Sequence, residues 1–218
     1  MATQESEALW ERGREILLAS PQLPISVDLE ADGIAGHGSI LQIGAKAITG
    51  EVFQSLVAPY SDDFLAGHQE FNAQHGLDRD RLREMAPPHS SVAANLSLWL
   101  KGLQEVHGKQ LLFVGLNSGY DFSLLDTFFV KAGMENPFGH SSEDIKTLAL
   151  LLGEQWDWDN TKQSRMPSII LPENGLTHDA LQDAEDQERM HLGMVAILDD
   201  PRVRQAIRTV IAEHTRAS

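Results

Sequence analysis

Two acidic residues, Asp28 and Glu30, stand one residue apart in the apolar stretch from Ile25 to Gly33. The stretch has the composition of a short strand, and side chains in a strand alternate between its two faces. We therefore expect Asp28 and Glu30 on one face and their apolar neighbours on the other. Two adjacent carboxylates repel each other and resist burial, and a cation bound to both relieves that cost. Taken alone, the pair favours the simpler reading that both acids face water at a strand end.

Further residues of suitable chemistry stand where two helices are expected to begin. Asp121 follows the apolar run 111–114 and the turn 117–119, where a buried strand is expected to lead into a helix. Ligand sites in α/β sheets gather beyond the carboxyl ends of strands, which is this position. His178 stands at another expected helix start, and Asp183 follows five residues on. Each acid also has a purely structural explanation, because the helix dipole favours acids in the first turn.

The surrounding sequence predicts the elements that position these side chains. Apolar segments at 38–48 and 52–58 flank a Thr-Gly-Glu turn, which predicts a hairpin continuing the acid-bearing strand. Strand–helix alternation follows and predicts a mixed sheet with helices packed on it. The region 60–89 is expected to be polar and irregular apart from one short helix, and Thr177 is a candidate N-cap. The expected helices cover 6–18, 78–85, about 90–107, 145–152, and segments starting near 121, 177 and 201.

Length and composition bound the class of protein. A chain of 218 residues suits one domain with a sizeable core, here at 23–218, with a helical extension at 1–22 packed against it. The formal net charge of −15 argues against broad attraction to nucleic acid or anionic membranes and favours metal sites or small substrates in a local pocket. The absence of cysteine excludes disulfides, thiolate nucleophiles and cysteine-ligated zinc. No apolar run approaches a membrane span, and the acidic N-terminus is unlike a secretory signal. We expect a cytoplasmic protein with no membrane partner.

The order and spacing of the acids form a longer pattern: Asp28-x-Glu30, then Asn117-x-x-x-Asp121-Phe122, then His178 with Asp183 five residues on. Two segments between the acids add to it: Leu41-Gln42-Ile43-Gly44-Ala45 and His75-Gly76-Leu77. Together they resemble the DEDDh subclass of 3′–5′ exonucleases over about residues 24 to 200. The resemblance implies the ribonuclease H-like fold, an α/β architecture with a mixed five-stranded sheet and helices on both faces.

The same resemblance implies an activity and its residues. The expected enzyme is a metal-dependent 3′–5′ exonuclease that shortens single-stranded DNA or RNA. Asp28, Glu30, Asp121 and Asp183 would hold two divalent cations, and oxygen ligands suit Mg²⁺ or Mn²⁺. By analogy, His178 is the general base and Glu30 also contacts the terminal 3′-hydroxyl. The residues expected to bind substrate are Leu29, Ala31, Leu77, Asn117 and Phe122.

Two other classes of function remain open from the sequence. One is a catalytically idle nucleic-acid or protein interaction module that keeps the exonuclease fold, although the intact acids and His178 speak against it. The other is an unrelated acid-rich metal-binding protein, which the ordered motifs disfavour. Trp156 and Trp158 are candidates to stack bases or to anchor the loop that contains them. The sequence does not determine oligomeric state or a preference for DNA or RNA.

Basic residues are few, which bears on substrate length. The chain has 17 Lys and Arg against 32 Asp and Glu, with no basic run that follows a long nucleic-acid backbone. The candidate phosphate contacts are Lys162, Arg165 and the group Arg79, Arg81 and Arg83. We therefore expect a grip on a few terminal nucleotides, so that short oligonucleotides are substrates. The remaining histidines show no shared metal-ligand spacing and are expected mostly at the surface.

Overall fold

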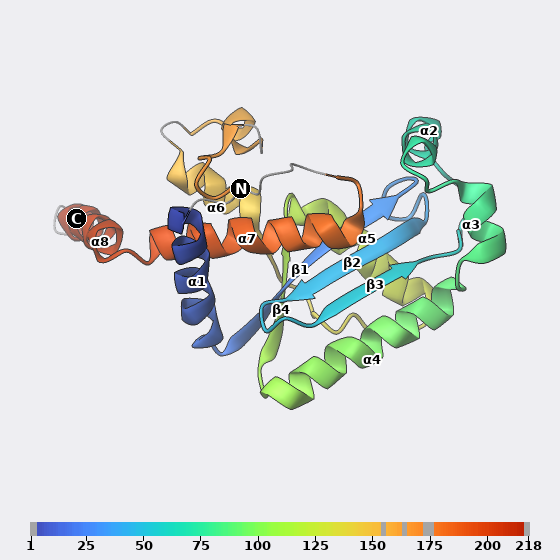
Figure 1. Cartoon of the computed structure of the whole chain (residues 1–218), viewed down its shortest axis with the longest axis horizontal. Helices are drawn as coiled ribbons and strands as arrows, with labels where there is room; N and C mark the ends of the chain where they lie inside the picture. The colour runs from blue at the N-terminus through green and yellow to red at the C-terminus, as the bar shows by residue number, and fades with distance from the viewer. Residues whose placement is uncertain (1–3, 154–155, 163–164, 172–176, 216–218) are drawn as a thin grey trace.

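A mixed sheet with helices on both faces forms the body of the protein (Figure 1). The computed structural model describes residues 4–153, 156–162, 165–171 and 177–215. Within these ranges the sheet has the expected five strands, and their order is β3-β2-β1-β4-β5. The strands are β1 (Gln22–Ala31), β2 (Ile40–Ala47), β3 (Val52–Leu56), β4 (Gln110–Gly115) and β5 (Ser142–Asp144). The sequence did not locate β5.

The helices follow the expected order, with two additions. They are α1 (Gln4–Leu18), α2 (Ala66–Gln74), α3 (Arg79–Met85), α4 (His89–His107), α5 (Ser118–Lys131), α6 (Ile145–Leu152), the 3₁₀ turn η1 (Trp158–Thr161), α7 (Ala180–Leu198) and α8 (Pro201–Thr215). The additions are α2, which occupies part of the region expected to be irregular, and η1, which lies in a segment expected to be a loop. Asn72 is the only buried residue of α2, so the sequence has no periodic apolar stripe from which this helix could be predicted.

Strand β1 lies at the centre of the sheet. It pairs antiparallel with β2, which places Asp28 opposite Gly44 and Glu30 opposite Gln42, and it pairs parallel with β4. Strands β2 and β3 form the expected antiparallel hairpin. Pro24 lies inside β1. Pro24 is tolerated there because pairing with β2 begins only one residue later.

The two faces of β1 differ in chemistry. Its apolar side chains join those of α4 and α5 in the main core; they are Leu23, Ile25, Val27 and Leu29. The alternate side chains, which include Asp28 and Glu30, project from the opposite face. Helix α7 crosses that face in Figure 1. The strand therefore supplies a core on one side and a pair of carboxylates under a helix on the other.

Helix α1 crosses α7 at close range (Figure 1). The approach depends on Gly13, because a Cβ at this position would overlap the backbone carbonyl of Leu192. The N-terminal segment thus packs on the helix that carries Asp183. Helix α8 continues beyond the far end of α7 in Figure 1. No helix in the described part of the chain is long and apolar enough to cross a membrane.

Candidate active site

Asp28 and Glu30 project from β1 beneath α7. Asp28 is half-buried, and Nε2 of Gln187 donates a hydrogen bond of 2.7 Å to its Oδ1. Burial raises the pKa of Asp28 well above its ordinary value, and three nearby carboxylates add to the rise, those of Asp121, Glu30 and Asp183. Burial, together with repulsion from Asp183, raises the pKa of Glu30 to about 7. Both carboxylates are therefore held where their negative charge is costly.

Asp121 reaches the same region from the first turn of α5. The turn before this helix holds Asn117 in the left-handed region, at φ 68°. Asp144, at the end of β5, accepts hydrogen bonds from the N–H groups of Asn117 (2.9 Å) and Ser118 (3.1 Å). Burial raises the pKa of Asp121 well above its ordinary value, and repulsion from Glu30 adds to the rise. Strand β5 thus anchors the turn that presents Asp121.

His178 lies in the loop before α7, not at the helix start that the sequence suggested. Asp179, rather than Thr177, is the N-cap, and its carboxylate accepts two backbone N–H groups of the first turn. Asp183 holds the loop from inside the helix. Its Oδ1 accepts the N–H of Thr177 at 2.7 Å, and its Oδ2 accepts the N–H of His178 at 2.9 Å. These bonds hold His178 at φ 59°, a region that non-glycine residues seldom occupy.

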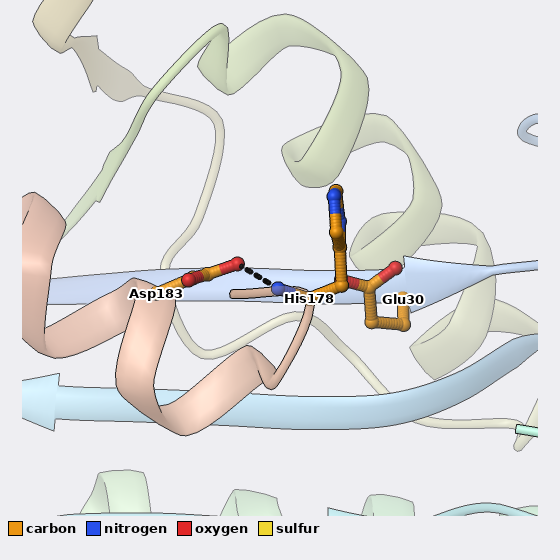
Figure 2. Close-up of side chains that lie close together, drawn as sticks. All are labelled: Glu30, His178 and Asp183. Atoms are coloured by element: carbon orange, nitrogen blue, oxygen red, sulfur yellow. Dashed lines mark hydrogen bonds and ion pairs between the residues drawn. The ribbon is translucent and has the colours of Figure 1, made fainter. Parts of the chain in front are cut away.

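Figure 2 shows the side chains of Glu30, His178 and Asp183 gathered from β1, the loop and α7. One ligand atom from each lies within 4.8 Å of the other two. Nδ1 of His178 is 3.7 Å from Oε1 of Glu30, and their side chains are 33% and 12% exposed. Asp28 and Asp121 are close enough for their charges to interact with this group. The structure therefore brings together all five residues that the sequence nominated for the chemistry.

The approach of α7 to the sheet depends on Gly44 of β2. A Cβ at Gly44 would overlap the backbone of Ala180, the first residue of α7. Gln42, two residues earlier, donates from Nε2 to Oδ2 of Asp179 at 3.3 Å. Gly44 appeared in the sequence only as part of a motif, and nothing local to it showed that a helix must fit against this strand.

A cleft of about 530 Å³ opens beside Glu30 and His178. Its size falls within the roughly 300–1,000 Å³ of ligand pockets. The end of β1 forms one side, and α2 forms another. The residues that line it are Leu29, Glu30, Ala31, Gly67, His68, Phe71, Asn72, Tyr120 and His178. The lining is mainly apolar and aromatic next to the carboxylates.

Residues 24–194 match the family described as the 3′-5′ exoribonuclease Rv2179c-like domain. The match spans most of the chain and includes every residue of the acidic cluster. The chain belongs to this family. It is therefore a 3′–5′ exonuclease, as the sequence resemblance predicted.

Individual relatives agree with the family. The 3′-5′ DNA exonuclease Cap18 of Escherichia coli is 28% identical over 169 residues, which cover 76% of this chain and 88% of that protein. The nuclease domain of 3′hExo, a DEDDh family member solved with rAMP, has a TM-score of 0.61 at 18% identity, over 79% of this chain and 91% of that one. E. coli exonuclease I, solved with a 5cy-dT13 oligonucleotide, has a TM-score of 0.59 at 15% identity. That match covers 86% of this chain but 43% of exonuclease I, so the chain spans less than half of that relative. The solved structures confirm the ribonuclease H-like fold.

The acidic cluster suits the divalent metal ions on which this exonuclease family depends. Its donors are carboxylate oxygens and one imidazole, and hard cations such as Mg²⁺ prefer oxygen ligands. The raised pKa values of Asp28 and Asp121 have burial and neighbouring acids as their causes, and no Lys or Arg of the described chain opposes them. A bound cation would favour the ionised carboxylates and remove this cost.

The residues expected to bind substrate divide into two groups. Leu29 and Ala31 line the cleft. Leu77 is buried in a small apolar cluster near α3, and Phe122 packs edge-on against another aromatic ring, with centroids 5.3 Å apart. Asn117 is the N-cap residue of α5, and its side chain makes no capping hydrogen bond. The side chains of Leu77 and Phe122 are thus placed to support the fold around the site.

The basic residues do not gather at the cleft. Arg79, expected to be available to phosphate, is 3% exposed and forms an ion pair with Asp32. Lys162 lies 3.2 Å from Asp159, and Arg165 lines a separate cavity of about 510 Å³ beside α6. Within the described part of the chain, no Lys or Arg lines the cleft beside Glu30.

Among the other histidines and the tryptophans of the described residues, His68 alone lines this cleft. His191, expected at the surface, is buried and lies 3.4 Å from Glu143. The ring of Trp158 lies under Nζ of Lys146 at 4.9 Å, and Trp156 is largely exposed. The position of Trp158 beside α6 is compatible with the anchoring role considered from the sequence.

Sequence reasoning missed the wall that α2 contributes to the cleft. Phe71 and Asn72 belong to this helix, and His75 caps its end. The available signal was the spacing of Phe71 and His75, because residues four apart share one side of a helix. Without a predicted helix at 66–74, that spacing did not indicate that Phe71 and His75 lie side by side.

Proposed function

We propose that this exonuclease removes nucleotides from the 3′ ends of single-stranded DNA or RNA by two-metal-ion hydrolysis, with His178 as general base. The observation that carries the proposal is the convergence of Glu30, His178 and Asp183, with one ligand atom from each within 4.8 Å of the others. Asp28 and Asp121 support it, because their carboxyl groups adjoin this cluster and have pKa values raised by burial and by nearby acids.

Each residue of the cluster has a role in the proposal. Asp28, Glu30, Asp121 and Asp183 would hold two Mg²⁺ or Mn²⁺ ions, which supply Lewis-acid stabilisation of charge on the reacting phosphate when bound. Glu30 lines the cleft and would also contact the terminal 3′-hydroxyl, which favours chain ends over internal bonds. His178 would accept the proton of the attacking water. Its Nδ1 is directed toward Glu30, which leaves Nε2 to take that proton.

The proposal includes both DNA and RNA as substrates. The family description names an exoribonuclease, and the E. coli relative is a DNA exonuclease. A cleft of about 530 Å³ has room for a terminal nucleotide. The lack of Lys and Arg in its described lining favours a grip on the chain end over contact with a long backbone. Short oligonucleotides are therefore sufficient substrates in this proposal.

The test is digestion of 5′-labelled single-stranded DNA and RNA oligonucleotides with Mg²⁺, Mn²⁺ or EDTA. We expect ladders that shorten from the 3′ end with either metal ion, no cleavage in EDTA, and no cleavage of strands with a blocked 3′-hydroxyl. Undiminished cleavage in EDTA, or internal fragments that appear first, would contradict the proposal. Asp62→Asn, a change at a fully exposed acid, is the matched control and should behave as the wild type.

A second test separates His178 from Asp183. His178→Ala should lower turnover by about 10²–10⁴-fold, the usual scale for loss of a general base, and leave metal affinity unchanged. Asp183→Ala should lower both turnover and metal affinity, because it removes a proposed metal ligand. Metal titration and single-turnover rates measure the two effects. Full turnover by His178→Ala across neutral pH would remove the proposed base.

A further inference from the structure

The imidazole ring of His178 touches two aromatic rings from the α2 segment. The ring of Phe71 meets it edge-on, with centroids 4.7 Å apart and planes at 89°. The ring of His75 lies 4.6 Å from it at 59°, and Phe71 and His75 are themselves 4.4 Å apart. The three rings form one cluster beside the cleft. We call the two rings from the α2 segment, those of Phe71 and His75, the aromatic wall.

This aromatic wall is fastened to the strand that carries Glu30. Nδ2 of Asn72, a buried residue of α2, donates to the carbonyl oxygen of Ala31 at 2.9 Å. Nδ1 of His75 lies 2.9 Å from the carbonyl oxygen of Phe71. A carbonyl only accepts, so Nδ1 of His75 carries a proton and the orientation of this ring is set by α2. The hydrogen bond from Asn72 therefore sets the position of the wall relative to Glu30.

We infer that Phe71 and His75 are positioning residues that hold the ring of His178 beside Glu30 through ring-to-ring contact. The inference rests on the proposed role of His178 as general base. Asp183 fixes the backbone of His178, but the side chain is 33% exposed and its χ angles are not set by that bond. A free histidine side chain has three χ1 wells and roughly two χ2 orientations, so about one conformer in six would place the ring correctly. Loss of the wall should therefore lower turnover about sixfold.

The test compares His75→Ala with His75→Phe, which keeps an aromatic ring at this position. His75→Ala removes one of the two rings of the wall, so it should lower kcat by up to about sixfold and leave KM and metal affinity unchanged. His75→Phe should recover most of kcat, and His140→Ala, at an exposed histidine that does not line the cleft, should match the wild type. Full kcat in His75→Ala would overturn the inference. Equal losses in both His75 variants would also overturn it, because the imidazole nitrogens rather than the ring would then be required.

A second measurement does not depend on turnover. The imidazole proton resonances of His178, assigned from the spectrum of His178→Ala, report the ring of Phe71 through its ring current. Phe71→Leu should shift these resonances, and His75→Ala should move them toward the values of a freely rotating histidine. Resonances that stay in place in both variants would overturn the inference. Full turnover in His178→Ala would instead show that His178 is not the general base, whatever the wild-type resonances say about its contacts with the wall. Failure of the proposed function and failure of this inference are therefore distinguishable.

Discussion

Asp28, Glu30 and Asp32 occupy alternate positions in one segment of the chain, yet their surroundings are of two kinds. Asp32 has no exposed surface, and Arg79 forms an ion pair with it. The N–H of Ser39 also donates to its Oδ1 at 2.6 Å. Burial raises the pKa of Asp32, and these two partners oppose the rise. Asp28 has mostly other acids around it, and the pKa values of Asp28 and Glu30 rise well above the ordinary range.

The presence or absence of a basic partner distinguishes an acid that supports the fold from the acids that we propose to bind a ligand. Asp32 already has its cation, and Arg79 also donates to the carbonyl of Ser61, which ties the loop before α2 to the end of β1. Asp28 and Glu30 have no Lys or Arg among the causes of their pKa shifts. The buried pair of Asp32 and Arg79 thus supports the cleft. Asp28 and Glu30 are the acids that we propose as metal ligands, because no Lys or Arg of the described chain neutralises them.

Asp28→Asn should have the largest effect on activity. A metal ligand contributes several kcal/mol to the transition state, so we expect turnover to fall by about 10³-fold or more. The metal-free protein should be no less stable than the wild type, because the substitution removes a repelled charge and its amide oxygen still accepts the hydrogen bond from Gln187. Single-turnover rates and thermal unfolding in EDTA measure the two quantities.

Asp32→Asn should show the opposite pattern. It leaves the guanidinium of Arg79 buried without its charge partner, which costs about 3–5 kcal/mol of the free energy of unfolding. Turnover per folded molecule should change far less than in Asp28→Asn. Urea unfolding and rates corrected for the folded fraction test this. If Asp28→Asn destabilised the metal-free protein as much as Asp32→Asn, the distinction between the two kinds of acid would be wrong.

The pH dependence of stability sharpens the same contrast. In EDTA the pKa of Glu30 rises from an ordinary 4.5 to about 7 on folding, so the folded state binds more protons than the unfolded state between these values. The free energy of unfolding should therefore fall as pH rises through this window, by up to about 3 kcal/mol. Glu30→Gln should make the curve less steep in urea titrations at pH 4.5 to 7, and the slope that remains belongs to groups such as Asp28 and Asp121, whose pKa values are also raised. An unchanged slope in that variant would show that Glu30 is not the group responsible.

The smallest expected effect concerns salt. Because Arg79 is committed to Asp32, few cations remain to contact phosphate, and we expect two or three contacts with a single strand. The slope of log affinity against log salt should then be about −1 to −2. The measurement uses Asp28→Asn, which should cleave too slowly to interfere, with oligonucleotides of increasing length. Affinity that keeps climbing with length, together with a steep slope, would reveal an extended binding track.

The sequence by itself nominated the residues of the candidate site. Period-two alternation placed Asp28 and Glu30 on one face of a strand, because a strand permits no other arrangement. Two other features are likewise local and do not depend on tertiary packing. They are the apolar run and turn before Asp121, and the five-residue spacing of His178 and Asp183. These five residues converge as predicted, and the sheet has the expected number of strands.

Only the tertiary structure showed which acid is paired with an arginine and which rings contact His178, the proposed base. Arg79 is 47 residues from Asp32 in the chain, so no local pattern distinguished this acid from its two neighbours. A side chain at Gly44 would overlap Ala180, because α7 lies against β2. Phe71 contacts the ring of His178, because α2 lies beside the loop before α7. In each case the deciding contact joins segments far apart in the sequence. Such contacts exist only once the chain has folded, and for that reason the local sequence carries no record of them.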